Sequence, residues 1–108
     1  MQRYDALLTE DAERDLSDIF DYIADQDSLA AANHVLDRIE KSIDTLSSFP
    51  ERGSFPKKLL ALGIRDYRQV FFGPYRMIYR VIETRVYIYL IVDGRRDMQT
   101  ILAHRLLG

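Results

Sequence analysis

The sequence predicts an α+β fold, in which an N-terminal pair of helices covers one face of a small antiparallel sheet. Residues 10–48 repeat apolar side chains at the spacing of a helical face. Two runs rich in Val, Ile, Tyr, Met and Leu, at 74–82 and 86–92, flank a short polar break, which is typical of two strands and a tight hairpin. Helices packed on one face of such a sheet give the α+β class.

The first part of the chain predicts a short strand followed by a helical hairpin. Residues 3–8 alternate in character, as a strand does. Thr9 suits a helix N-cap, because acidic residues follow it in what would be the first turn. Ser28 is the next cap candidate, and its helix should run to about Ser48. Two antiparallel helices joined by a few residues result.

The rest of the chain predicts a three-stranded meander and a short C-terminal helix after Asp97. A strand at 67–72 is broken by glycine and proline, which cannot continue a ladder. The run 86–92 is apolar or aromatic at every position, so it should lie near the centre of the sheet. In the preceding run, Arg76 and Arg80 should share one face of the strand with Ile78.

Length and composition indicate one soluble domain that spans residues 1–108. The chain has 108 residues, no cysteine and two histidines far apart in sequence. Disulfides and thiolate chemistry are therefore excluded, and neither a metal site nor a cofactor is expected. No window reaches the roughly 18 apolar residues of a membrane span. We expect a cytoplasmic protein.

Charge divides the chain into two halves of opposite sign. Residues 1–51 carry 13 acidic and 4 basic side chains, whereas residues 52–108 carry 4 acidic and 11 basic ones. Such asymmetry favours a partner of one sign for each half, although acidic helices facing solvent would give the same pattern. Most of the basic residues fall in or near the predicted strands.

The arginines of the second half are the candidate functional residues, because a guanidinium group keeps its charge when partly buried and binds phosphate or carboxylate oxygens in pairs. The alternative is that some only form ion pairs with nearby acids, and for Arg80 a pair with Glu83 is expected. The candidate target-binding residues are Arg68, Arg76, Arg95 and Arg96.

Five sequence motifs occur in an order and spacing that resemble the RelE/ParE superfamily of type II toxin-antitoxin toxins. They are T-x-D-A-x-x-D-L at 9–16, D-Y-I at 21–23, R-I-E-x-x-I-x-x-L-x-x-F-P-x-R-G at 38–53, P-Y-R-x-I-Y-R-V at 74–81 and G-R-R-D at 94–97. Together they cover nearly the whole chain. The resemblance implies a single toxin domain with helices on a small sheet.

The superfamily holds two activities, and the residues help to choose between them. In its RelE-like members, which are ribosome-dependent mRNA endonucleases, the resemblance implies catalytic roles for Arg68, Arg76 and Arg96. Val70 stands in place of a second lysine, and Leu102 in place of a tyrosine. Each positioned acid-base group is worth about 10²–10⁴-fold in rate, so the loss of both should largely silence that mechanism.

The ParE-like branch, which poisons DNA gyrase, needs no such catalytic set and is the expected identity. Asp93 stands where ParE-like sequences often have histidine. The alternatives are an mRNA endonuclease, with His104 replacing the missing tyrosine, and a structural protein without toxic activity.

The resemblance also implies a cognate antitoxin as a partner in a hetero-oligomer. We expect a helix of the antitoxin to pack its leucines on apolar residues that the toxin leaves uncovered and to set basic side chains against the acidic helix. The candidate antitoxin-binding residues are Asp15, Asp18, Asp21, Asp25, Leu59, Leu60 and Leu62.

Overall fold

The computed structural model describes residues 3–93, 100–101 and 104–105. Along this part of the chain the elements are β1 (Asp5–Leu8), α1 (Glu10–Gln26), α2 (Leu29–Ser48), α3 (Lys57–Ala61), β2 (Arg68–Phe72), β3 (Tyr75–Ile82) and β4 (Arg85–Asp93). The α+β prediction is confirmed. The expected C-terminal helix after Asp97 falls largely outside the described residues.

The helix boundaries follow the caps that the sequence contains. The Thr9 hydroxyl accepts a hydrogen bond from the Ala12 backbone N–H at 3.2 Å, and the Ser28 hydroxyl accepts one from the Ala31 N–H at 3.0 Å. Each cap satisfies a backbone donor that the first helical turn leaves unpaired. The predicted hairpin of α1 and α2 is confirmed.

The strands form one sheet in the order β1-β4-β3-β2. The meander of β2, β3 and β4 is antiparallel, as expected, and β4 lies inside the sheet. The N-terminal strand differs from the expectation, because β1 runs parallel to β4, with Asp5 opposite Arg85 and Leu8 opposite Ile88. The sheet is therefore mixed. Three helices separate β1 from the other strands, and this length of chain allows the crossover that a parallel pair requires.

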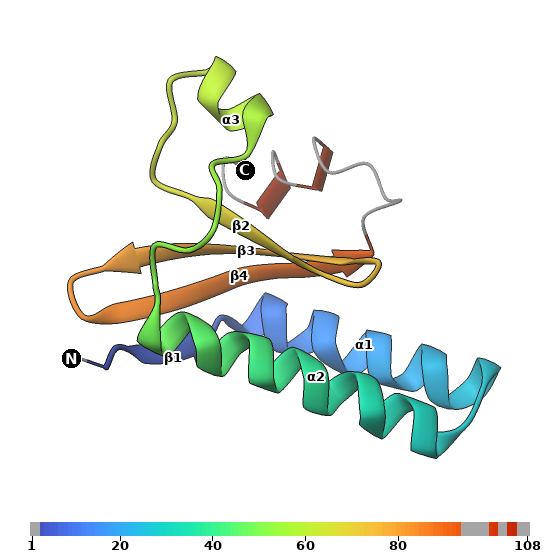
Figure 1. Cartoon of the computed structure of the whole chain (residues 1–108). Coiled ribbons are helices and arrows are strands. Elements are labelled where there is room, and N and C mark those ends of the chain that lie inside the picture. The colour runs from blue at the N-terminus through green and yellow to red at the C-terminus, as the bar shows by residue number, and fades with distance from the viewer. Residues whose placement is uncertain (1–2, 94–99, 102–103, 106–108) are drawn as a thin grey trace.

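The two faces of the sheet carry different cover (Figure 1). The hairpin of α1 and α2 packs on one face, here called the hairpin face, where its apolar side chains meet those of Val70, Met77 and Tyr79. The opposite face, here called the α3 face, carries a second cluster in which Leu59 of α3 packs with Ile78. Both clusters bury strand residues, so the sheet is the middle layer of the protein.

A β-bulge lets β4 serve both clusters. Tyr79 pairs with Ile88, but its neighbour Ile78 pairs with Leu90, so Tyr89 is the extra residue. Before the bulge Ile88 points to the hairpin face, and after it Leu90 points to the α3 face. The continuous apolar run of β4 is therefore buried on both sides, as expected for a central strand.

Candidate functional site

Arg76 and Arg80 lie on the α3 face of β3, as the alternation of the sequence predicts. The Arg76 guanidinium lies 4.9 Å from the centre of the Phe71 ring, and that of Arg80 lies 5.9 Å from the Tyr67 ring. Phe71 is 56% exposed. The Nε atom of Arg76 is buried and has no hydrogen-bond partner among the residues that the structure describes. Arginine and aromatic rings thus alternate on this face, an arrangement typical of binding surfaces.

The expected ion pair between Arg80 and Glu83 is not formed. Among the described residues Arg80 has no salt bridge, and its cationic group packs on the Tyr67 ring instead. Tyr67 in turn meets Tyr89 edge to face, with 5.6 Å between the ring centres. The hairpin turn holds Glu83 in the left-handed region at φ 56°. Arg80 is therefore part of the aromatic surface. Its closeness to Glu83 in the sequence suggested an ion pair and gave no sign of the contact with Tyr67.

Arg68 lies apart from Arg76 and Phe71, although it lines a cleft of about 450 Å³ that Arg80 also lines. It pairs in register with Tyr79, whose side chain packs in the core of the hairpin face. Its guanidinium donates hydrogen bonds to the backbone carbonyls of Gly53 at 2.8 Å and Glu51 at 3.2 Å, and it lies 4.4 Å from the Phe55 ring centre. The structure therefore separates Arg68 from Arg76. Arg95 and Arg96 fall outside the described residues.

The loop after α2 is folded around Tyr79, and this brings its backbone carbonyls within hydrogen-bonding distance of the Arg68 guanidinium. The Tyr79 hydroxyl donates to the Pro50 carbonyl at 2.7 Å and accepts from the Gly53 N–H at 3.0 Å. A Cβ atom on Gly53 would lie 2.6 Å from that hydroxyl oxygen, so only glycine fits. Burial raises the pKa of Tyr79, because desolvation disfavours the phenolate. The F-P-x-R-G motif thus has a structural role here.

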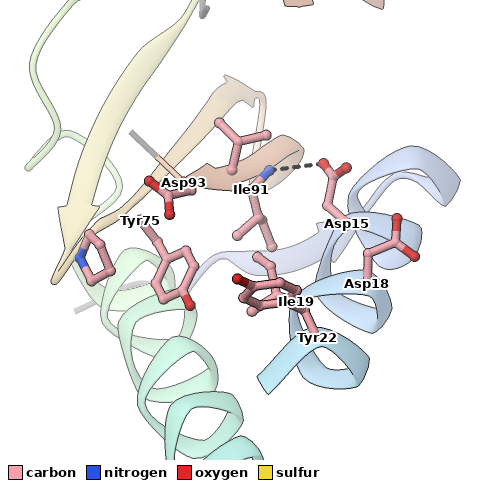
Figure 2. Close-up of a pocket in the computed structure, with 9 residues that line it drawn as sticks. Asp15, Asp18, Ile19, Tyr22, Tyr75, Ile91 and Asp93 are labelled. Atoms are coloured by element: carbon pink, nitrogen blue, oxygen red, sulfur yellow. Dashed lines mark hydrogen bonds between the residues drawn. The ribbon is translucent and has the colours of Figure 1, made fainter. Parts of the chain in front are cut away.

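A cleft of about 560 Å³ opens on the hairpin face of the sheet, between α1 and the adjacent ends of β3 and β4 (Figure 2). Four of its lining residues lie on α1, spaced so that they share one helical face. The remainder come from the turn before β3, the first residue of β3 and the end of β4. The described lining residues are Asp15, Asp18, Ile19, Tyr22, Pro74, Tyr75, Ile91, Val92 and Asp93.

Asp15 is buried at the edge of this cleft, so it is not the exposed acid that the helical pattern predicts. Its carboxylate forms a bidentate ion pair with Arg105, with both N–O distances at 2.7 Å. It also accepts a hydrogen bond from the Ile91 backbone N–H at 3.0 Å (Figure 2). Arg105 donates further to the Tyr89 carbonyl at 3.2 Å. The ion pair raises the pKa of Arg105, so this cation stays charged.

The ion pair of Asp15 and Arg105 closes the edge of β4 beyond the end of β1. β1 pairs with β4 only as far as Ile88. After that point the Ile91 N–H and the Tyr89 carbonyl find side-chain partners in Asp15 and Arg105. Buried backbone groups need such partners. The sequence held no signal of it, because the two side chains are 90 positions apart.

The other predicted antitoxin-binding residues are divided between two places. Asp21 and Asp25 are exposed on α1 but do not line the cleft. Leu59 was expected to be uncovered, which is wrong, because it is 5% exposed in the cluster of the α3 face. Leu62 is 68% exposed, and Leu60 is half-buried. Since α3 lies across the sheet from α1, the structure does not bring these leucines together with the acids (Figure 1).

Metal and membrane sites gain no support from the described residues. Within 3–93, 100–101 and 104–105, no three metal-binding side chains come together. In the same ranges no helix is long and apolar enough to cross a membrane. The arrangement offers instead two surfaces, the arginine and aromatic side chains of the α3 face and the acidic cleft beside α1.

Comparison with known proteins agrees with this geometry. The sequence profile of a family described as the ParE toxin of the type II toxin-antitoxin system parDE matches residues 6–98. The fold is similar to a solved structure of the chromosomal ParDE system from P. aeruginosa, with a TM-score of 0.71, 17% identity, and coverage of 86% of this chain and 98% of the other. At that identity only the fold is compared.

A second solved structure, the toxin-antitoxin complex RelBE2 from Mycobacterium tuberculosis, is also similar. Its TM-score is 0.58 at 26% identity, covering 84% of this chain and 98% of that chain. No curated protein matches the sequence. The family profile nevertheless spans most of the chain, with the helical hairpin, the meander and all of β1 except Asp5 inside the matched range. The chain therefore belongs to the ParE toxin family of type II toxin-antitoxin systems.

Proposed function

We propose that this protein arrests growth by inhibiting DNA gyrase, and thereby DNA replication, and that a cognate antitoxin neutralises it. The observation that carries the proposal is the match of residues 6–98 to the ParE toxin family. The protein would act by binding, because its target is itself the enzyme that cuts DNA. The alternative is an mRNA endonuclease, which the similarity to the RelBE2 complex favours.

The environment of β2 supports gyrase inhibition over mRNA cleavage. The endonuclease hypothesis needs a side chain at position 70 that transfers a proton. Valine cannot do so, and Val70 is 5% exposed and packs in the core of the hairpin face. It also needs a free cation at position 68, and Arg68 donates to two backbone carbonyls. Without positioned acid-base groups, a large part of the rate enhancement would be missing.

Arg76 is the proposed target contact among the described residues. It is half-buried on β3 and packs on the exposed ring of Phe71. Arginine and aromatic side chains held by a rigid sheet contribute strongly to protein interfaces, since little entropy is lost on binding. Arg95 and Arg96 are proposed to extend this surface. Arg68 would support it only indirectly, by fixing the loop before β2.

Inducing the protein alone separates the functions. Inhibited gyrase would give filamentous cells and a DNA-damage response, whereas an mRNA endonuclease would give rapid loss of translation with cleaved transcripts. Normal growth would contradict both. With purified components, we expect the protein to stabilise gyrase-dependent DNA breaks and to leave ribosome-bound mRNA intact. Cleaved mRNA with unaffected gyrase would establish the alternative.

A further inference from the structure

We propose that the cleft beside α1 receives an arginine or lysine side chain of the antitoxin. The identity of this partner rests on the proposed function, whereas the binding chemistry rests on the cleft alone. The cleft has a volume of about 560 Å³, within the range of pockets that hold a small ligand. One long side chain with its flanking backbone can be accommodated there.

The walls of the cleft combine negative charge with aromatic and aliphatic surface. Asp15, Asp18 and Asp93 contribute carboxylates, of which Asp15 is paired with Arg105 and Asp93 also has a partner of its own, and no described lining residue is basic. Tyr22 and Tyr75 contribute rings, with Ile19 packed beside Tyr22 on the same side of α1 (Figure 2). A cation is attracted to both carboxylates and ring faces, while a long aliphatic stem packs on apolar side chains. Arginine and lysine have both parts.

Asp18 is the anchoring carboxylate of this wall. Asp15, three residues earlier on the same helical face, is already engaged by Arg105 and the Ile91 N–H. Asp18 is exposed, and it forms no ion pair with any residue of the described chain. The bidentate pair of Asp15 with Arg105 shows the same type of contact one turn away. A guanidinium entering the cleft would meet Asp18 in a similar setting.

The ring of Tyr22 provides the outer wall. It is 66% exposed, which is high for a large aromatic side chain on a well-packed helix. It lies one turn after Asp18 and lines the same cleft, with its ring directed away from that carboxylate and toward Tyr75 (Figure 2). A neutral or acidic partner side chain would cover these carboxylates without compensating their lost hydration. The cleft therefore selects a basic segment through its charge and its shape.

The binding chemistry is tested by titrating the ¹⁵N-labelled protein with capped arginine, N-acetyl-arginine methylamide, and following its amide resonances. We expect saturable shifts around Asp18, Tyr22 and Ile91. Capped citrulline, which has the same shape without the charge, should bind roughly tenfold more weakly, since the ion pair and the ring contact are both lost. Shifts that do not saturate, or equal binding of citrulline, would overturn the proposal.

Matched variants locate the contact. Asp18→Asn should weaken arginine binding by about two- to fivefold, the range of an exposed ion pair, and Tyr22→Ala by a similar factor. Asp21→Asn removes the same charge from α1 outside the cleft and should leave binding unchanged. If Asp21→Asn weakens binding as much as Asp18→Asn, the binding is explained by a general attraction to the acidic hairpin and not by the cleft.

The antitoxin is then tested as the occupant. We expect Asp18→Asn to dissociate from the purified antitoxin about two- to fivefold faster than wild type, with Asp21→Asn unchanged. An unaltered dissociation rate for Asp18→Asn would rule the antitoxin out as the source of the basic side chain. Neither binding measurement depends on gyrase, so a failure of the cleft and a failure of the proposed toxicity are distinguishable.

Discussion

Asp15 shows how strongly a single residue can depart from the pattern around it. It belongs to a run of acids on α1 whose pattern predicts a solvated helix face. Its side chain is nevertheless only 10% exposed, and it is paired with Arg105, whose side chain is 22% exposed. A charge taken out of water needs such a partner, and the Ile91 backbone N–H adds a further hydrogen bond to the Asp15 carboxylate. The pair joins α1 to β4 and to the C-terminal part of the chain.

Asp15→Ala should therefore destabilise the protein by about 3 kcal/mol, because it leaves Arg105 and the Ile91 N–H without their acceptor. Urea unfolding monitored by circular dichroism measures this. Asp18→Ala, on the same helix face but without an ion pair in the described residues, should change stability by about 0.5 kcal/mol or less. Equal effects of the two variants would show that the ion pair contributes nothing.

Tyr79 should make stability depend on alkaline pH. Its pKa is raised above the usual value of 10, mainly by burial, so the unfolded chain loses this proton before the folded protein does. The stabilisation is complete below about pH 10 and declines as pH rises through the folded-state pKa. Tyr79→Phe should cost about 1–3 kcal/mol at pH 7, since it removes the bonds to Pro50 and Gly53.

The measurement is the free energy of unfolding of both proteins from pH 7 to 11. The gap between wild type and Tyr79→Phe should narrow above pH 10, because the variant lacks the ionising group. A gap that stays constant over this range would show that ionisation of Tyr79 is not linked to folding.

Elements whose signals are local could be predicted from the sequence, and pairings between distant segments could not. Thr9 and Ser28 fix the helix starts through neighbouring residues, and both caps are confirmed. The alternation that places Arg76 opposite to Met77 is also local. The direction of β1, the burial of Leu59 and the engagement of Arg68 by the Gly53 carbonyl depend on tertiary contacts. No periodicity encodes these, so candidate residues that looked equivalent in sequence fell on opposite faces of the sheet.

Strand β3 provides the functional prediction at the scale of an element. Arg76→Ala should weaken toxicity, because the variant loses the cation that packs on Phe71 at the proposed target surface. Arg80→Ala, on the same face of the same strand but over Tyr67, is the matched control and should remain more toxic. Growth after induction measures toxicity. Thermal unfolding should confirm that both variants are folded, with changes in the free energy of unfolding of about 1 kcal/mol or less. Full toxicity of folded Arg76→Ala would remove this residue from the target surface.

At the scale of the whole molecule, charge and architecture coincide. The helical hairpin belongs to the half of the sequence that carries a net charge of −9, and the other strands, β2 to β4, belong to the half that carries +7. The hairpin covers one sheet face, so negative charge gathers on that side of the protein (Figure 1). A total charge of −2 conceals this division. A basic antitoxin segment would be steered toward the hairpin before it makes any close contact.

This steering should appear in the association rate. Lysines in place of Asp21 and Asp25 reverse two exposed charges of α1 that do not line the cleft, so they act on the approach of the antitoxin more than on the final contacts. We expect this double variant to associate roughly three- to tenfold more slowly at low salt, with little change in dissociation. At high salt the rates of variant and wild type should converge, because the screening length falls to about 3 Å at 1 M. Stopped-flow measurement at both salt concentrations decides the matter. An association rate that is unchanged at low salt would mean that the acids of the hairpin are only solvated and that the antitoxin approaches from another side.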